Sequence, residues 1–133
     1  MPRKPSILVV DDEENVTRTL QMVFEREGYE VTPAYSSAEA VSILNNGHTL
    51  DAVITDLNME EEDIGLEVAR AARRLRPRPV IVICTGFANL DNSKEALQMH
   101  VDYLANKPVD LDELTSALRR LMSRRQLSLR GRR

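Results

Sequence analysis

The residues of this chain that could do chemistry follow directly after short apolar runs. The runs lie at 7–10, 52–54, 80–84 and near 103–105. The polar residues that end them are Asp11 and Asp12, Thr55 and Asp56, Thr85, and Asn106 and Lys107. Three carboxylates, a hydroxyl and an ammonium group in one place would suit a divalent cation and a phosphoryl group, because oxygen ligands hold a hard cation and the cation attracts phosphate oxygens.

These residues come together only if the apolar runs are neighbouring parallel strands. The carboxyl ends of such strands share one edge, where open α/β sheets bind their ligands. The strands that we expect lie at 7–10, 29–34, 52–55, 80–84 and about 103–105. They alternate with segments of helical period, a pattern typical of a parallel sheet covered by helices on both faces.

Five helical segments are predicted from periodicity, caps and breakers. The first helix follows Asp12 and ends at Gly28, and the second begins with the capping box of Ser36 and Glu39. The third helix begins at Gly65 and ends before Pro77. The fourth is a weakly amphipathic stretch at 89–98, and the last is capped by Asp110 and Glu113. Each has an apolar stripe that can pack on a sheet, although the fourth has little beyond Leu90 and Leu97.

Length and composition favour a single domain without a membrane-spanning segment. A chain of 133 residues suits one domain, and its apolar runs are far shorter than the ~18 residues of a membrane span. The start of the chain has no secretory signal, and its single cysteine cannot form an internal disulfide. We therefore expect a cytoplasmic protein without a membrane segment.

Charge is unevenly distributed along the chain. Residues 119–133 hold seven of the 18 basic residues and no acid, so the remainder is strongly acidic. An acidic body argues against direct nucleic-acid binding by the domain itself. We divide the chain into an N-terminal extension at 1–5, one domain at 6–122, and a basic tail or linker stub at 123–133.

Two adjacent aspartates before a helix are, by themselves, weak evidence of a metal site, because either could be a helix cap. The order and spacing of four motifs are more specific. The motifs are the acidic opening at 9–13, Asp56 at a strand end, Thr85-Gly86, and Lys107-Pro108. Together, over residues 6–122, they resemble the receiver domains of two-component response regulators, of which the chemotaxis receiver is the simplest.

The resemblance implies a fold and a function. The fold would be a flavodoxin-like, doubly wound sheet of five parallel strands in the order 2-1-3-4-5, with five helices. The protein would act as a phosphorylation-dependent switch and would catalyse its own phosphorylation and dephosphorylation. Phosphorylation would alter the surface formed by helix 4, strand 5 and helix 5. Its partners would be a histidine kinase or phosphotransfer protein and a downstream protein or output domain, and a phosphorylation-dependent homodimer is compatible with it.

The resemblance also implies roles for individual residues. Asp56 would accept the phosphoryl group. Mg²⁺ would be held by Asp11, Asp12 and Asp56 and by the backbone carbonyl of Asn58. Thr85 would hydrogen-bond the phosphoryl group as the switch, and Lys107 would contact a phosphoryl oxygen. The bond between Lys107 and Pro108 is usually cis in the family.

The chain departs from the family pattern at several positions. The aromatic residue that usually stands three before the lysine is replaced by Leu104, and Tyr103 stands one place earlier. Because side chains alternate along a strand, Tyr103 is expected on the other face, so either Leu104 acts as a smaller apolar plug or Tyr103 is an exposed ring. Four consecutive acids at 60–63 follow Asp56, and Phe87 stands where it could exclude water from a phosphoryl group.

Two other functions remain as alternatives. A receiver-like module could bind partners without phosphate. A haloacid-dehalogenase-like phosphatase also uses a strand-end aspartate and Mg²⁺, but it requires a second aspartate where this chain has Asn58. We assign Cys84 as a buried hydrophobe, and no zinc site to His48 and His100.

Overall fold

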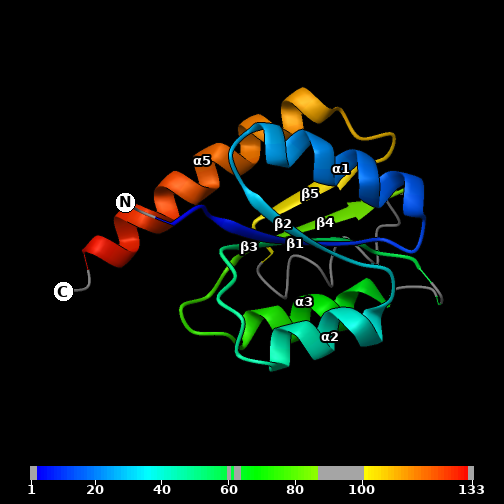
Figure 1. The fold of residues 1–133 in the computed structure, drawn as a ribbon, viewed down its shortest axis with the longest axis horizontal. Helices are drawn as coiled ribbons and strands as arrows, with labels where there is room; N and C mark the ends of the chain where they lie inside the picture. The colour runs from blue at the N-terminus through cyan, green and yellow to red at the C-terminus, as the bar shows by residue number, and fades with distance from the viewer. Residues whose placement is uncertain (1–2, 60, 62–63, 87–100, 132–133) are drawn as a thin grey trace.

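A five-stranded parallel sheet forms the centre of the domain (Figure 1). The computed structural model describes residues 3–59, 61, 64–86 and 101–131. The strands are β1 (Ser6–Val10), β2 (Glu30–Ala34), β3 (Ala52–Asp56), β4 (Val80–Thr85) and β5 (Tyr103–Asn106). They lie in the order β2-β1-β3-β4-β5, which confirms the predicted flavodoxin-like topology.

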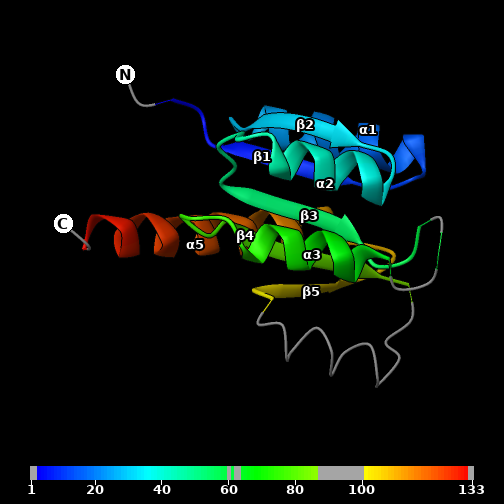
Figure 2. The same ribbon diagram turned by 90° about the horizontal axis from the view of Figure 1, so that it is seen from below.

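Helices cover both faces of the sheet. The described helices are α1 (Glu14–Arg26), α2 (Ser37–Asn45), α3 (Gly65–Arg73) and α5 (Leu111–Arg130). Figures 1 and 2 show α1 and α5 on one face and α2 and α3 on the other. The fourth helix predicted at 89–98 lies outside the described residues.

Two of the predicted caps are present. The hydroxyl of Ser36 accepts a hydrogen bond from the backbone N–H of Glu39 at 3.1 Å, and a carboxylate oxygen of Asp110 accepts one from Glu113 at 3.1 Å. Each bond satisfies a backbone donor that has no partner inside its helix, which fixes where α2 and α5 begin.

Side chains of the strands alternate between two apolar layers, one on each face of the sheet. In β1, Leu8 and Val10 pack toward α2 and α3, while Ile7 and Val9 pack toward α1 and α5. All four are at most 1% exposed, and burying each such side chain contributes roughly 1.5–3 kcal/mol. This burial on both faces explains why the inner strands are continuous apolar runs.

The last helix is longer than the sequence suggested. Residues 123–130, expected as a basic tail or linker stub, continue α5 as a regular helix for about two more turns. Leu121 and Met122 pack against the core on the α1 side of the sheet, and Arg125 makes an ion pair with Asp51. Among the described residues, no helix is long and apolar enough to cross a membrane.

Candidate functional site

Three carboxylates meet at the carboxyl edge of the sheet. Asp11 follows β1, Asp12 is next to it, and Asp56 ends β3. One oxygen from each carboxylate lies within 4.8 Å of the others. Asp11 and Asp56 are buried, at 2% and 7% exposed, and Asp12 is exposed to solvent. The structure therefore brings together the three acids that the sequence predicted.

Asp11 is held by its backbone and by its own side chain. Its N–H donates to the carbonyl of Ala34 at 3.1 Å, and one carboxylate oxygen accepts from the N–H of Glu13 at 2.9 Å. The buried hydroxyl of Thr17 donates to the carbonyl of Asp11 at 3.0 Å. Because the N-cap of α1 is Glu13, neither aspartate is the helix cap that we considered as an alternative.

Asp56 is positioned by the turn that follows it. The N–H of Leu57 donates to the carbonyl of Cys84 at 2.8 Å, which joins this turn to β4. The N–H of Gly65 donates to the carbonyl of Leu57 at 2.8 Å and brings the start of α3 against the turn. A Cβ on Gly65 would overlap the carbonyl oxygen of Asp56, so the approach requires glycine.

The ammonium group of Lys107 lies between the two buried acids. Nζ of Lys107 is 3.1 Å from Oδ1 of Asp56 and 3.4 Å from Oδ2 of Asp11. The lysine follows β5, and its N–H donates to the carbonyl of Thr85 at 2.8 Å. Its peptide bond to Pro108 is cis, as the resemblance implied.

The charges of these groups perturb one another. Burial raises the pKa of Asp56, the nearby Lys107 ammonium lowers it, and Asp11 raises it again, with a net increase. Burial lowers the pKa of Lys107, but attraction to Asp56 and Asp11 outweighs burial and raises it. The protonated form of the lysine is therefore favoured, whereas for Asp56 the cost of burying the charged form outweighs the attraction to Lys107.

Thr85 ends the strand between β3 and β5, and Asn58 follows Asp56 by two residues. Thr85 ends β4 and is 2% exposed, and it stands next to Asn106 in the pairing of β4 with β5. Asn58 is two residues beyond β3 and is exposed. Phe87 and His100 lie outside the described residues, as do three of the four acids at 60–63; only the exposed Glu61 is described.

Tyr103 and Leu104 lie on opposite faces of β5, as the alternation predicted. Tyr103 packs on the α5 side, where its hydroxyl interacts with the Glu113 carboxylate, and Leu104 packs on the other apolar layer. Burial, followed by the charge of Glu113, raises the pKa of Tyr103. Both side chains are half-buried.

A cavity of about 420 Å³ adjoins the acids. Its lining is largely apolar and includes Val16 and Leu20 of α1, Val109 before α5, and Leu111 at the start of α5. Asp56 and Lys107 also line it. The cavity is thus an apolar space bordered on one side by the charged cluster.

Cys84 is a buried hydrophobe, as predicted. It is 4% exposed and pairs with Asp56 across β3 and β4. Burial raises the pKa of its thiol to about 12, so it is not a nucleophile at neutral pH. His48 is exposed and belongs to no group of metal-ligating side chains in the part of the chain that the structure describes.

Sequence reasoning missed two residues that support the site. Thr17 faces inward from the first turn of α1, and Gly65 must lack a side chain because it meets the turn after Asp56. The only signal for Thr17 was its place within two turns of the acid pair. The signal for Gly65 was a glycine inside the first turn of a helix, where it is otherwise unfavourable.

Comparisons with known proteins agree with this geometry. A family model described as the response regulator receiver domain matches residues 7–119. The transcriptional regulatory protein GlrR of Escherichia coli (strain K12) is 34% identical over 89% of this chain and 26% of its own length. The alginate biosynthesis transcriptional regulatory protein AlgB of Pseudomonas putida is 37% identical over 93% of this chain and 27% of its own. The chain spans about a quarter of these two regulators.

Solved structures show the same fold. A response regulator receiver domain protein from Clostridium thermocellum superposes with a TM-score of 0.82 at 31% identity, covering 92% of this chain and 98% of that one. A CheY-like receiver domain protein from Methanospirillum hungatei JF-1 has a TM-score of 0.86 at 25% identity, covering 94% and 98%.

Proposed function

The chain belongs to the receiver domains of response regulators, and on that premise we propose that Asp56 is its phosphoacceptor and that a phosphohistidine-bearing protein is the donor. The observation that carries this proposal is the contact of Asp56 with Lys107 at 3.1 Å beside two further acids. No other described carboxylate combines a strand end, a lysine and two neighbouring acids.

The neighbouring acids differ from Asp56 in ways that suit another role. One oxygen of Asp11 already accepts from the N–H of Glu13, and Asp12 is exposed and stands outside the strands. These two carboxylates, one oxygen of Asp56 and the backbone carbonyl of Asn58 are the groups that would hold a cation. An all-oxygen donor set with open positions for water and phosphate fits Mg²⁺. When bound, Mg²⁺ would offset the repulsion between an anionic acceptor and an anionic donor.

The transfer itself requires little of the protein beyond positioning. A carboxylate oxygen of Asp56 forms a bond to phosphorus as the bond between phosphorus and the donor's histidine nitrogen breaks. The donor ring carries a proton on its other nitrogen, so an acyl phosphate and a neutral imidazole are left. Lys107 remains protonated and contacts a phosphoryl oxygen as a compact charge. The hydroxyl of Thr85 would then hydrogen-bond the phosphoryl group, whose added charge of roughly -1.5 to -2 biases the loop that follows β4.

Partners follow from the same proposal. The donor would be a histidine kinase or a phosphotransfer protein in the cytoplasm. The readout would be a downstream protein or an output domain that senses the surface around β5 and α5, with a phosphorylation-dependent homodimer as one form of that readout. The relatives named as transcriptional regulators support an output of this kind, since the receiver is a minor part of their length.

The test uses a small phosphodonor. Acetyl phosphate with Mg²⁺ should add one phosphate to the chain, as measured by intact mass, and Asp56→Asn should abolish the addition. Asp112→Asn, an exposed aspartate on α5, is the matched control and should label normally. Undiminished labelling of Asp56→Asn would show that another residue is the acceptor, and no labelling of the wild type would favour a phosphorylation-independent binding module.

Phe87 bears on how long the phosphate survives. A large apolar ring near the acyl phosphate would exclude water and offer it no hydrogen-bond partner, so a persistent phosphoryl group is expected. Replacing Phe87 with Glu or Ala should speed dephosphorylation and leave Mg²⁺ affinity nearly unchanged. Equal decay rates for the wild type and both variants would remove this shielding role.

A further inference from the structure

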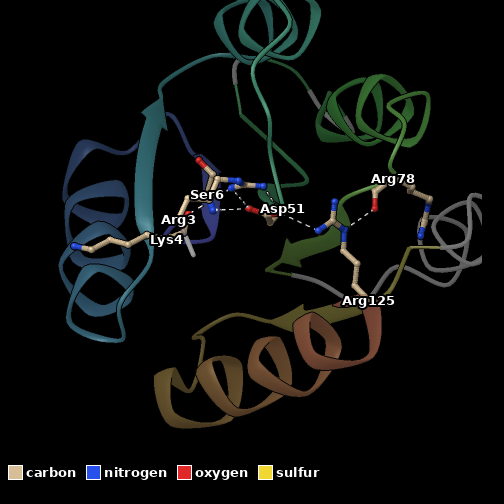
Figure 3. Close-up of polar contacts among 6 residues, drawn as sticks. All are labelled: Arg3, Lys4, Ser6, Asp51, Arg78 and Arg125. Carbon is tan, nitrogen blue, oxygen red and sulfur yellow. Dashed lines mark hydrogen bonds and ion pairs between the residues drawn. The ribbon is translucent and has the colours of Figure 1, made fainter. Parts of the chain in front are cut away.

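The opposite edge of the sheet, where the strands begin, carries another buried carboxylate. Asp51 immediately precedes β3 and is 6% exposed. Figure 3 shows its side chain between two guanidinium groups from distant parts of the sequence. The phosphorylation chemistry does not use any of these residues, because Asp51 and Asp56 stand at opposite ends of the same strand.

The contacts of Asp51 join both ends of the described chain. Arg3 donates to its two oxygens at 2.8 and 3.2 Å, and the N–H of Ser6 donates to Oδ2 at 2.8 Å. Arg125 on α5 donates to Oδ1 at 2.8 Å. Bonds of this kind are the stronger ones in proteins, because both partners are charged and the acceptor is removed from water.

Arg125 extends the network to the next strand. Its Nε donates to the carbonyl of Arg78 at 2.9 Å, just before β4. Arg78 in turn pairs with Asp102, whose carboxylate accepts from the N–H of Ile81 at 2.7 Å. The side chain of Arg125 is only 12% exposed, whereas that of Arg3 is 57% exposed. Arg125 is therefore the better buried of the two arginines bound to Asp51.

We propose that Asp51 and Arg125 form a clasp that docks the distal half of α5 on the strand-start edge of the sheet and so sets the direction in which this helix leaves the domain. Beyond Met122, α5 offers the sheet little apolar surface, and Leu127 is 67% exposed. The packing that stabilises most protein helices is thus weak in this half of α5, and the polar clasp takes its place.

The clasp does not depend on the phosphoacceptor proposal. It rests on contacts at the other edge of the sheet, and it concerns the position of a helix rather than a reaction. A receiver that could not be phosphorylated would still have its last helix fixed by Asp51. The experiment below therefore measures helix opening and uses no phosphodonor.

Native-state hydrogen exchange of the whole chain tests the proposal. Arg125→Gln keeps the side-chain stem but loses the charge, so amides at 121–127 should exchange at least about tenfold faster. Asp51→Asn keeps an acceptor for the N–H of Ser6 and should accelerate the same amides. Arg124→Gln is the matched control, since Arg124 is exposed and forms no ion pair with any residue in the described ranges, and it should change these rates less than twofold.

The amides of β3 separate local docking from global stability. They should exchange at the wild-type rate in Arg125→Gln if the clasp holds α5 alone. The proposal is wrong if Arg125→Gln behaves like Arg124→Gln. It is also wrong if β3 and α5 accelerate equally, because the ion pair would then stabilise the whole domain rather than dock the helix.

Discussion

The ammonium of Lys107 and the carboxylate of Asp56 lie 3.1 Å apart although they come from strands that do not pair with each other. β4 separates β3 from β5 in the sheet, so this ion pair passes over the end of β4 at Thr85. The same ammonium is 3.4 Å from Asp11 beyond β3. Lys107, which follows β5, thus contacts an acid after β1 and an acid at the end of β3. Its ammonium lies beside the same carboxylates that would attract a metal cation.

Removing this ammonium should strengthen cation binding. Lys107→Met keeps the stem but removes the ammonium that contacts Asp56 and Asp11, and we expect Mg²⁺ affinity to rise roughly tenfold because the fixed charge no longer competes. Labelling by acetyl phosphate should slow at least about tenfold. Lys4→Met, which removes an exposed lysine, is the control. Weaker Mg²⁺ binding by Lys107→Met in calorimetry would contradict this account.

Metal affinity should depend on the clustered acids and not on the acidic run after Asp56. Asp12→Ala removes a carboxylate from the cluster of three and should weaken Mg²⁺ binding by about tenfold or more. Glu61→Ala, an exposed acid of that run, should change it less than about twofold, since exposed charges are screened. A titration in which substitutions at 60–62 cost more affinity than Asp12→Ala would refute the ligand assignment.

The raised pKa of Asp56 predicts a pH dependence of stability. The folded domain holds this proton to higher pH than the unfolded chain does, so ionisation of Asp56 lowers the free energy of unfolding as pH rises through and beyond the unfolded pKa. Asp56→Asn mimics the protonated acid. Without Mg²⁺ it should therefore raise the Tm at pH 7, and the gain should vanish below the unfolded pKa of about 3.9.

The control for this prediction is the addition of Mg²⁺. Saturating Mg²⁺ should narrow or reverse the advantage of Asp56→Asn, because the cation stabilises only the chain that keeps the carboxylate. A Tm difference that does not vary between acid and neutral pH would mean that ionisation of Asp56 does not set it.

Gly65→Ala should destabilise the domain even though alanine favours helices. The new Cβ would overlap the backbone of Asp56 and Leu57, and shifting that turn should cost about 1–3 kcal/mol in the free energy of unfolding. Gly131→Ala is the control: its Cβ would meet no described atom closer than 3.5 Å. Urea unfolding measures the free energy of unfolding of both variants. A stabilised Gly65→Ala would show that the turn is not tightly constrained.

The strands and the acid cluster could be read from the sequence because both depend on local patterns. Continuous apolar runs mark buried parallel strands, and the parallel arrangement alone brings Asp11 and Asp56 to one edge. The alternation of Tyr103 and Leu104 follows from the strand period in the same way. The strand bounds agree within one residue, as for β3, which includes Asp56.

The end of α5 could not be read in this way. An arginine-rich stretch without acids has the composition of a solvated tail, and nothing near Arg125 in sequence shows that it reaches Asp51. Asp51 itself looks like an ordinary turn residue before a strand. Contacts between charged residues far apart in sequence leave no periodic signal, so the helix was placed too short.

The buried thiol of Cys84 can serve as a built-in probe of how often the domain opens near β4. It is the only cysteine of the chain, it lies in β4 beside the end of β3, and its thiol ionises only at about pH 12 in the closed state. Because the thiol is 4% exposed and its pKa is raised, its reaction with a thiol reagent should be slow in the closed state and faster when β4 becomes accessible. The rate of alkylation therefore reports how often the thiol becomes accessible, with no introduced label. It can be measured as Mg²⁺ or a phosphodonor is added.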